Sequence, residues 1–167
     1  MTIAEILLQD YDAEMKNTRT TLERIPEDKP DFKPHEKSMP FGRLAVHVAS
    51  LPRFGMTILT TPELNMATTQ FPTLVFESRE KLLSDFDAIA AETRGHLASA
   101  TDEHLRQDWR LVWGDKVIAE APRSVLYRTM FFNHLIHHRA QLGVYLRLNN
   151  LPVPPLYGPS ADDSMGF

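Results

Sequence analysis

The chain contains no cysteine among its 167 residues. This absence excludes disulfide bonds, a thiolate nucleophile supplied by the protein, and zinc or iron–sulfur sites built on sulfur ligands. A bound metal ion would therefore be held by histidine, carboxylate, carbonyl or water ligands.

The sequence also lacks an excess of basic residues, because 18 Lys and Arg stand against 22 Asp and Glu, which gives a formal charge of −4. A surface that binds nucleic acid needs a basic patch to neutralise phosphates, so no nucleic-acid partner is expected. The seven glycines are isolated and form neither a Gly-x-Gly-x-x-Gly motif nor a phosphate-binding loop. A nucleotide cofactor is therefore not expected either.

Long apolar runs and a basic leader are missing as well. No stretch approaches the roughly 20 apolar residues that span a bilayer, and the N-terminal segment turns acidic after eight residues, unlike a signal peptide. We therefore expect a soluble, cytoplasmic protein without a membrane partner. The length and the 43% hydrophobic content predict one domain, residues 1–167, with a core of its own.

Helical periodicity is present in long segments that proline-rich connections separate. The segments cover about residues 2–25, 40–58, 78–97 and 122–149. Thr2 with Glu5 predicts a capping box at the first start, and Ser78 is the predicted N-cap of the third segment. Pro52 lies inside the second segment and predicts a kink or an early end there.

The period changes before the last of these segments. Residues 108–118 alternate around Gly114 and Asp115, a pattern that indicates a short β-hairpin, whereas residues 59–77 are predicted to be a loop. The predicted fold class is all-α: a four-helix bundle with long crossover loops and a short β-hairpin before the last helix.

Three of the seven histidines stand where apolar residues are expected on a helix face. His134 and His138 share one stripe of the last predicted helix, about 40° apart around its axis, and His47 lies between the apolar Leu44 and Leu51. Burying imidazoles is unfavourable unless they form hydrogen bonds or bind a cation. The pair and His47 could together bind one ion with a position left open, as in catalytic zinc sites.

The spacing alone leaves a second interpretation open, in which the three histidines are core residues that hydrogen-bond to backbone carbonyls. Two specific metal chemistries are disfavoured. Leu135 follows His134 where a zincin protease has its glutamate base, and the Glu-x-x-His motif of ferritin-like di-iron sites does not occur in the sequence.

Three motifs resemble those of the DinB-like (DNA-damage-inducible) family. They are FKPHEKSMPFGRLAVHVASLP at residues 32–52, NHLIHHRAQLGVYLR at residues 133–147 and PPLYGPSADD at residues 154–163. The resemblance covers nearly the whole chain, and it implies a four-helix bundle, a homodimer and a divalent metal held by His47, His134 and His138. Zinc or nickel is the metal expected at an all-histidine site, with iron as an alternative.

The resemblance does not fix a reaction, because related bundles include transferases and isomerases that depend on small thiols, as well as some hydrolases, and many members have no assigned reaction. Our leading hypothesis is a metal-dependent S-transferase that uses a low-molecular-weight thiol and a small-molecule substrate. The absence of protein cysteine fits a thiol that comes from outside the chain. A metal-dependent hydrolase with the same ligands and a non-catalytic, stress-associated dimeric bundle stay open as alternatives. No catalytic residue is assigned.

Other polar and aromatic residues are weaker candidates for the site. His35 is expected to be exposed in a loop. Trp109 and Trp113 are expected to pack on the helices rather than line a substrate groove. Arg139 points off the histidine stripe, so an ion pair or a helix contact is expected for it.

Polar residues also flank the histidine pair and occupy the tail. Asn133 and Gln141 are candidates to orient the ligands through hydrogen bonds. Tyr157 and Asp162 are expected to lie in a surface tail rather than at the site.

Overall fold

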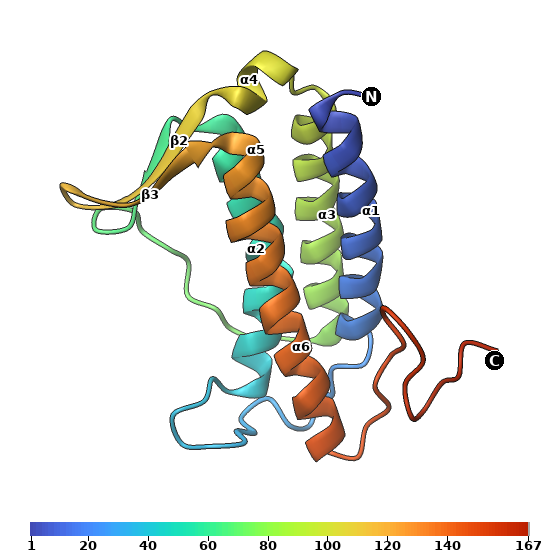
Figure 1. The fold of residues 1–167 in the computed structure, drawn as a ribbon. Coiled ribbons are helices and arrows are strands. Elements are labelled where there is room, and N and C mark those ends of the chain that lie inside the picture. Colours follow the sequence, from blue (N-terminus) through green and yellow to red (C-terminus); the bar gives the residue numbers. More distant parts are fainter. Residues whose placement is uncertain (167) are drawn as a thin grey trace.

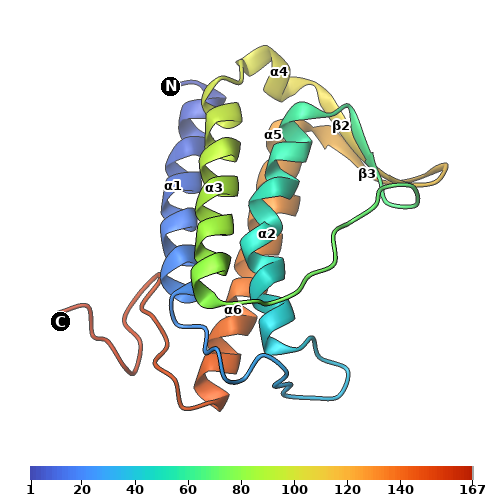
Figure 2. The same ribbon diagram turned by 180° about the vertical axis from the view of Figure 1, so that it is seen from behind.

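The computed structural model describes residues 1–166 and is mostly helical. Its elements are α1 (Ile3–Leu22), α2 (Phe41–Thr60), β1 (Glu63–Asn65), α3 (Arg79–Ala98), α4 (Asp102–Arg106), β2 (Asp108–Trp113), β3 (Lys116–Pro122), α5 (Arg123–Leu126), the π-helix η1 (Tyr127–Phe132) and α6 (Asn133–Leu148). The long helices α1, α2 and α3 lie side by side with the rod formed by α5, η1 and α6 (Figure 1). The strands form a small sheet at one end of these helices, and the opposite view shows the same arrangement (Figure 2).

Helices α1 and α3 begin where the sequence predicts. The Thr2 hydroxyl accepts a hydrogen bond from the Glu5 backbone N–H, and the Glu5 carboxylate accepts one from the Thr2 N–H, which completes the capping box. The Ser78 hydroxyl accepts a hydrogen bond from the Lys81 N–H at the start of α3. These caps satisfy N–H groups that have no partner within the helix.

Helix α2 runs through Pro52 to Thr60, so the early end that was one of the two expected outcomes does not occur. Proline has no N–H to donate to the carbonyl of Val48. However, Pro52 is buried, and its own carbonyl accepts a hydrogen bond of 3.0 Å from the Thr93 hydroxyl of α3. Packing against α3 therefore stabilises the helix across the proline.

The last predicted helix is one rod with a π-helical section in its middle. This section, η1, carries Tyr127, Phe131 and Phe132, which are buried and have ring centroids 5.0–5.3 Å apart. A π-turn is wider than an α-turn, and here it accompanies the burial of all three rings. The section ends two residues before His134, so the histidine pair itself lies on regular α-helix.

The predicted hairpin is present, but it belongs to a three-stranded sheet within residues 1–166. β2 and β3 are antiparallel, and Gly114 at their turn has a φ of +57°, in the left-handed region that glycine adopts without strain. β1 pairs in parallel with β2, so the prediction of a loop over residues 59–77 is wrong for Glu63–Asn65. The all-α class therefore describes most of the chain but omits this sheet, and the prediction also lacks the short helix α4.

Apolar side chains from the long helices form one core. Leu44, Leu51 and Leu142, which flank the three histidines in sequence, are buried in it. The histidines themselves are half-buried, at the edge of this core. Within residues 1–166, no helix is long and apolar enough to cross a membrane.

Two glycines inside helices are expected to respond in opposite ways to alanine. A Cβ atom on Gly55 of α2 would lie 2.8 Å from the Phe131 ring of η1, whereas one on Gly95 of α3 would meet open space. We expect Gly55→Ala to lower the free energy of unfolding by about 1–3 kcal/mol, and Gly95→Ala to raise it by about 0.5–1 kcal/mol. Urea denaturation measures both changes. A Gly55→Ala protein as stable as the parent would contradict the close packing of α2 on η1.

Candidate metal centre

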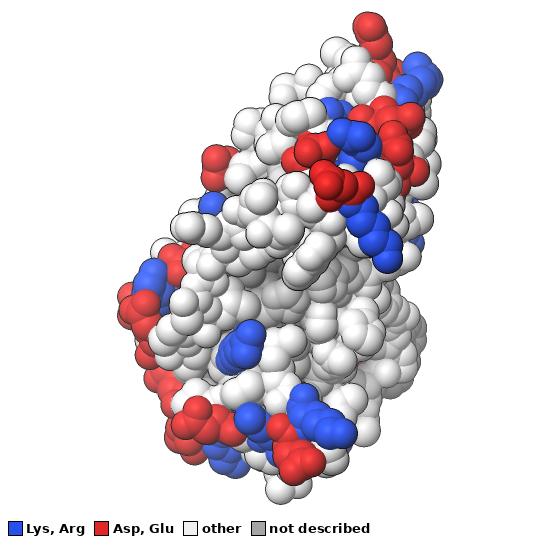
Figure 3. All heavy atoms as spheres, turned by 90° about the vertical axis from the view of Figure 1, so that its left-hand side faces the viewer, with Lys and Arg blue, Asp and Glu red and all other residues white. Residues whose placement is uncertain are grey.

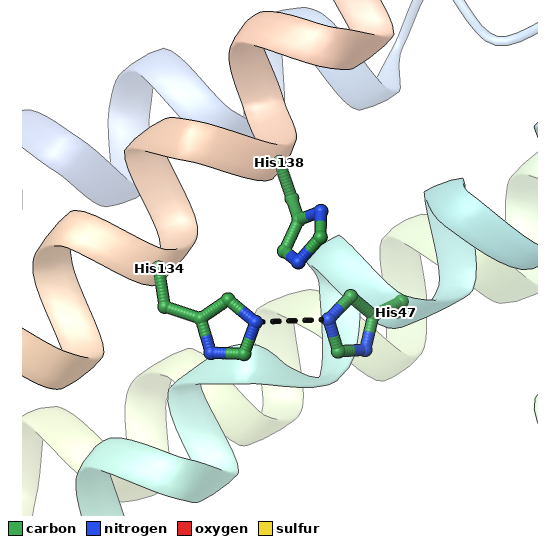
Figure 4. A group of neighbouring side chains, drawn as sticks. All are labelled: His47, His134 and His138. Atoms are coloured by element: carbon green, nitrogen blue, oxygen red, sulfur yellow. Dashed lines mark hydrogen bonds between the residues drawn. The ribbon is translucent and has the colours of Figure 1, made fainter. Parts of the chain in front are cut away.

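The side chains of His47, His134 and His138 converge between α2 and α6 (Figure 4). His47 comes from α2, and the other two lie one turn apart on α6. Each offers a ring nitrogen, and these nitrogens all lie within 4.8 Å of one another. The fold thus brings together the three residues that the sequence singles out, and the group could hold a metal ion.

One pair of the nitrogens already has the spacing that one small cation requires. Two imidazole nitrogens bound tetrahedrally at the usual zinc distance of about 2.0–2.1 Å are about 3.3–3.4 Å apart. The Nε2 atoms of His47 and His134 are 3.3 Å apart, which matches this value and is long for an N–H···N hydrogen bond. All three imidazoles are half-buried, so the group is also accessible from solvent.

Gln141 fixes the orientation of one of the three rings. Its Oε1 atom lies 2.7 Å from Nδ1 of His138, so Nδ1 carries the proton and donates it, which leaves the lone pair of Nε2 for a cation. The amide nitrogen of Gln141 is 3.3 Å from Nε2 of His137. In this arrangement the amide presents its oxygen to His138 and its nitrogen to His137, which agrees with the role expected for Gln141.

Burial keeps the three imidazoles uncharged near neutral pH. The pKa of His47 is lowered to about 4, first by burial and then by the charges of His138, His134 and Arg43. Burial is also the largest cause that lowers the pKa of His134 and of His138. The neutral imidazole is the form that binds metals, so these environments prepare the group for a cation.

The sequence matches a family model described as the DinB family over residues 2–165. The chain belongs to the DinB family. A crystal structure of a DinB-like protein from Bacillus subtilis has the same fold, with a TM-score of 0.68 and 22% identity over 90% of this chain and 96% of that chain. A DinB-like protein from Bacillus cereus gives a TM-score of 0.67 and 20% identity over 90% and 95% of the two chains. No curated protein matches the sequence.

In this DinB-family chain, the two tryptophans have different surroundings. Trp109 is buried and donates a hydrogen bond of 3.2 Å to the Thr61 hydroxyl. Its ring lies 6.1 Å from that of Phe54, which in turn lies 6.3 Å from the His134 ring. Trp113, by contrast, is 60% exposed on the hairpin. The expectation that both pack on the helices therefore holds for Trp109 and is wrong for Trp113.

Several other candidates lie away from the three histidines of the DinB fold. His35 is exposed in the loop before α2, as expected. Asn133 accepts a hydrogen bond of 2.9 Å from Arg128 and does not orient the histidine pair. Sequence reasoning missed Arg43, whose charge acts on His47. The available signal was its position four residues before His47, on the same side of a helix.

Tyr157 and Asp162, the candidates in the C-terminal tail, hold the tail against the helices. The Tyr157 hydroxyl donates to the carboxylate of Glu14 on α1, at 2.7 Å from Oε2. The Asp162 carboxylate accepts a hydrogen bond of 2.6 Å from Arg147 on α6. Arg139 is buried and forms the expected ion pair, here with Glu14. None of these contacts involves the three histidines.

The lowered pKa values predict how the metal-free protein responds to acid. As the pH falls, the unfolded chain binds protons on its histidines before the folded chain does, so folding becomes less favourable. We expect the free energy of unfolding to decrease from the ordinary histidine pKa of 6.5 down to about 4, the pKa of His47. Urea denaturation at several pH values measures this slope. In His47→Gln, the free energy of unfolding should depend less steeply on pH. An unchanged dependence in that variant would contradict the lowered pKa of His47.

Proposed function

We propose that this protein is a metal-dependent S-transferase, an enzyme that joins the sulfur of a small thiol to a carbon atom of a small electrophilic substrate. In this function, α1, α2, α3 and the α5–η1–α6 rod act as a four-helix bundle that holds one divalent ion on His47, His134 and His138. Zinc or nickel is the expected metal, with iron as an alternative. The observation that supports this function most directly is the group of three ring nitrogens within 4.8 Å of one another.

His47, His134 and His138 would hold the ion through neutral imidazoles, and the ion would lower the pKa of a bound thiol, so that the sulfur would be ionised near neutral pH. The residues of the chain prepare this site in three ways. Burial keeps the imidazoles uncharged. Gln141 holds the His138 ring by a hydrogen bond, and Phe54 places an aromatic ring beside His134.

The charges around the histidines favour thiol transfer over hydrolysis. Within residues 1–166, the groups that shift the pKa values of the three ligands are other histidines, Arg43 and Gln141, and no carboxylate is among them. Metal-dependent hydrolases commonly use a carboxylate as the base that takes a proton from water. A thiol that is already ionised needs no such base.

In the proposed reaction, the thiol sulfur forms a bond to an electrophilic carbon while the bond from that carbon to its leaving group breaks. The leaving group departs with the bonding electron pair, and the thiol proton passes to solvent. Every atom of the product thioether therefore comes from the two substrates, and the protein supplies no nucleophile of its own, in keeping with a sequence that has no cysteine.

The test is an assay of untagged protein, loaded with zinc or nickel, with small thiols and an electrophile that carries a leaving group. Mass spectrometry should detect a thioether whose formation needs the metal and stops in His134→Ala. His96→Ala changes an exposed imidazole of α3 that does not act on the three histidines and should retain activity. If no thiol is consumed and an ester or amide is cleaved instead, the hydrolase alternative replaces the transferase; if neither reaction occurs, the non-catalytic alternative replaces both.

A further inference from the structure

Arg43 lies at the edge of the three-histidine group without a partner for its charge. It precedes His47 by four residues on α2, so both side chains lie on the same side of the helix. The guanidinium is close enough for its charge to lower the pKa of His47. The side chain is exposed, and none of the ion pairs within residues 1–166 involves it.

Within residues 1–166, no carboxylate is among the groups that shift the pKa values of the three histidines. The side of the molecule on which α2 and α6 lie is hollowed at mid-height and almost free of acidic side chains there, whereas such side chains gather towards its two ends (Figure 3). A divalent ion on three neutral imidazoles would keep about two positive charges, and Arg43 adds a third. Such a site favours ligands that carry a second negative charge besides the coordinating atom.

We propose that Arg43 binds an oxyanion group of the thiol substrate, so that the protein selects thiols that carry a carboxylate or a phosphate. This assignment rests on the proposed function of the same site. A guanidinium presents paired N–H donors that match two oxygens of either group. Residues four apart on a helix have Cβ atoms about 5–6 Å apart, so the side chains of Arg43 and His47 start from neighbouring positions on α2.

The experiment uses untagged protein loaded with Co²⁺, because thiolate coordination to this ion gives an absorption band that reports binding. The probes are 3-mercaptopropionate and its neutral amide, 3-mercaptopropionamide, which differ in charge and hardly in size. The wild type should bind the acid about fivefold more tightly than the amide, the upper end for an exposed ion pair. Arg43→Gln should abolish this preference, and Arg43→Lys should keep part of it. A thiol phosphonate of the same length then distinguishes a phosphate-type from a carboxylate ligand.

Arg53→Gln is the matched control, because Arg53 is also an exposed arginine of α2 and is not among the groups that act on the three histidines. Its preference for the acid should equal that of the wild type. Equal binding of acid and amide by the wild type, or an unchanged preference in Arg43→Gln, would overturn the assignment and leave the proposed function standing. If no thiol binds the loaded protein, the proposed function itself fails and this assignment fails with it.

Discussion

Replacing His134 with alanine is expected to lower the affinity of the protein for zinc at least about a hundredfold. Substitution of groups that only orient metal ligands already costs about 10–100-fold in affinity, and His134 offers one of three ligand nitrogens in the group. Competition with a chromogenic chelator measures the dissociation constant. The protein must be untagged, because a histidine tag would bind zinc itself.

His96 supplies the control for this substitution. It lies on α3, its side chain is exposed, and it is not among the groups that act on the three histidines. His96→Ala should change the zinc affinity within about twofold, the effect of an ordinary surface change of about 0.5 kcal/mol. Equal losses in the two variants, or zinc binding by His134→Ala as tight as in the parent, would contradict a centre built on His47, His134 and His138.

Replacing Glu14 with alanine is expected to lower the free energy of unfolding by about 3–5 kcal/mol, as when one partner of a buried ion pair is removed. The Glu14 carboxylate lies 2.6 Å from a guanidinium nitrogen of Arg139, whose side chain is 1% exposed. Without this carboxylate, Arg139 keeps only uncharged partners, among them the Thr18 hydroxyl at 3.0 Å. The Tyr157 hydroxyl also loses its acceptor, so the tail is held less firmly. Urea denaturation measures the change.

The double variant Glu14→Gln, Arg139→Met separates the charge from the packing. Removing both charges leaves no uncompensated ion in the core, and such exchanges are often close to neutral in stability. We therefore expect the double variant to be more stable than Glu14→Ala. If Glu14→Ala is the more stable of the two, the charge on buried Arg139 does not need the carboxylate, and the interpretation of this pair is wrong.

The parts of the fold that could be predicted depend on residues close together in sequence. Thr2 and Ser78 accept hydrogen bonds from N–H groups three residues further along the chain. The starts of α1 and α3 are therefore determined by neighbouring residues in the sequence. Strand β1 could not be found in this way, because its three residues pair with β2 far along the chain. The π-helical section depends likewise on how the rings of Tyr127 and Phe131 pack in the core.

The candidate site likewise has a part that neighbouring residues in the sequence predict and a part that depends on the packed fold. His134 and His138 are one turn apart on a helix and His47 interrupts an apolar face, so their grouping could be inferred from periodicity. The role of Gln141 could only be suggested, since a flanking amide can hydrogen-bond in several directions. The position of Arg43 four residues before His47 is a local signal, but the burial that is the largest cause of the lowered pKa of His47 depends on the packed fold. Local pattern thus predicts the candidate ligands, while tertiary packing decides how deeply they are buried.

Anomalous diffraction from a crystal of the untagged, zinc-loaded protein, measured at the zinc absorption edge, tests the central claim most directly. We predict one peak per chain, about 2.0–2.1 Å from Nε2 of His47, His134 and His138. A crystal without a peak at this position would contradict the account. So would a peak only at His96 or His104, which line a separate small cleft.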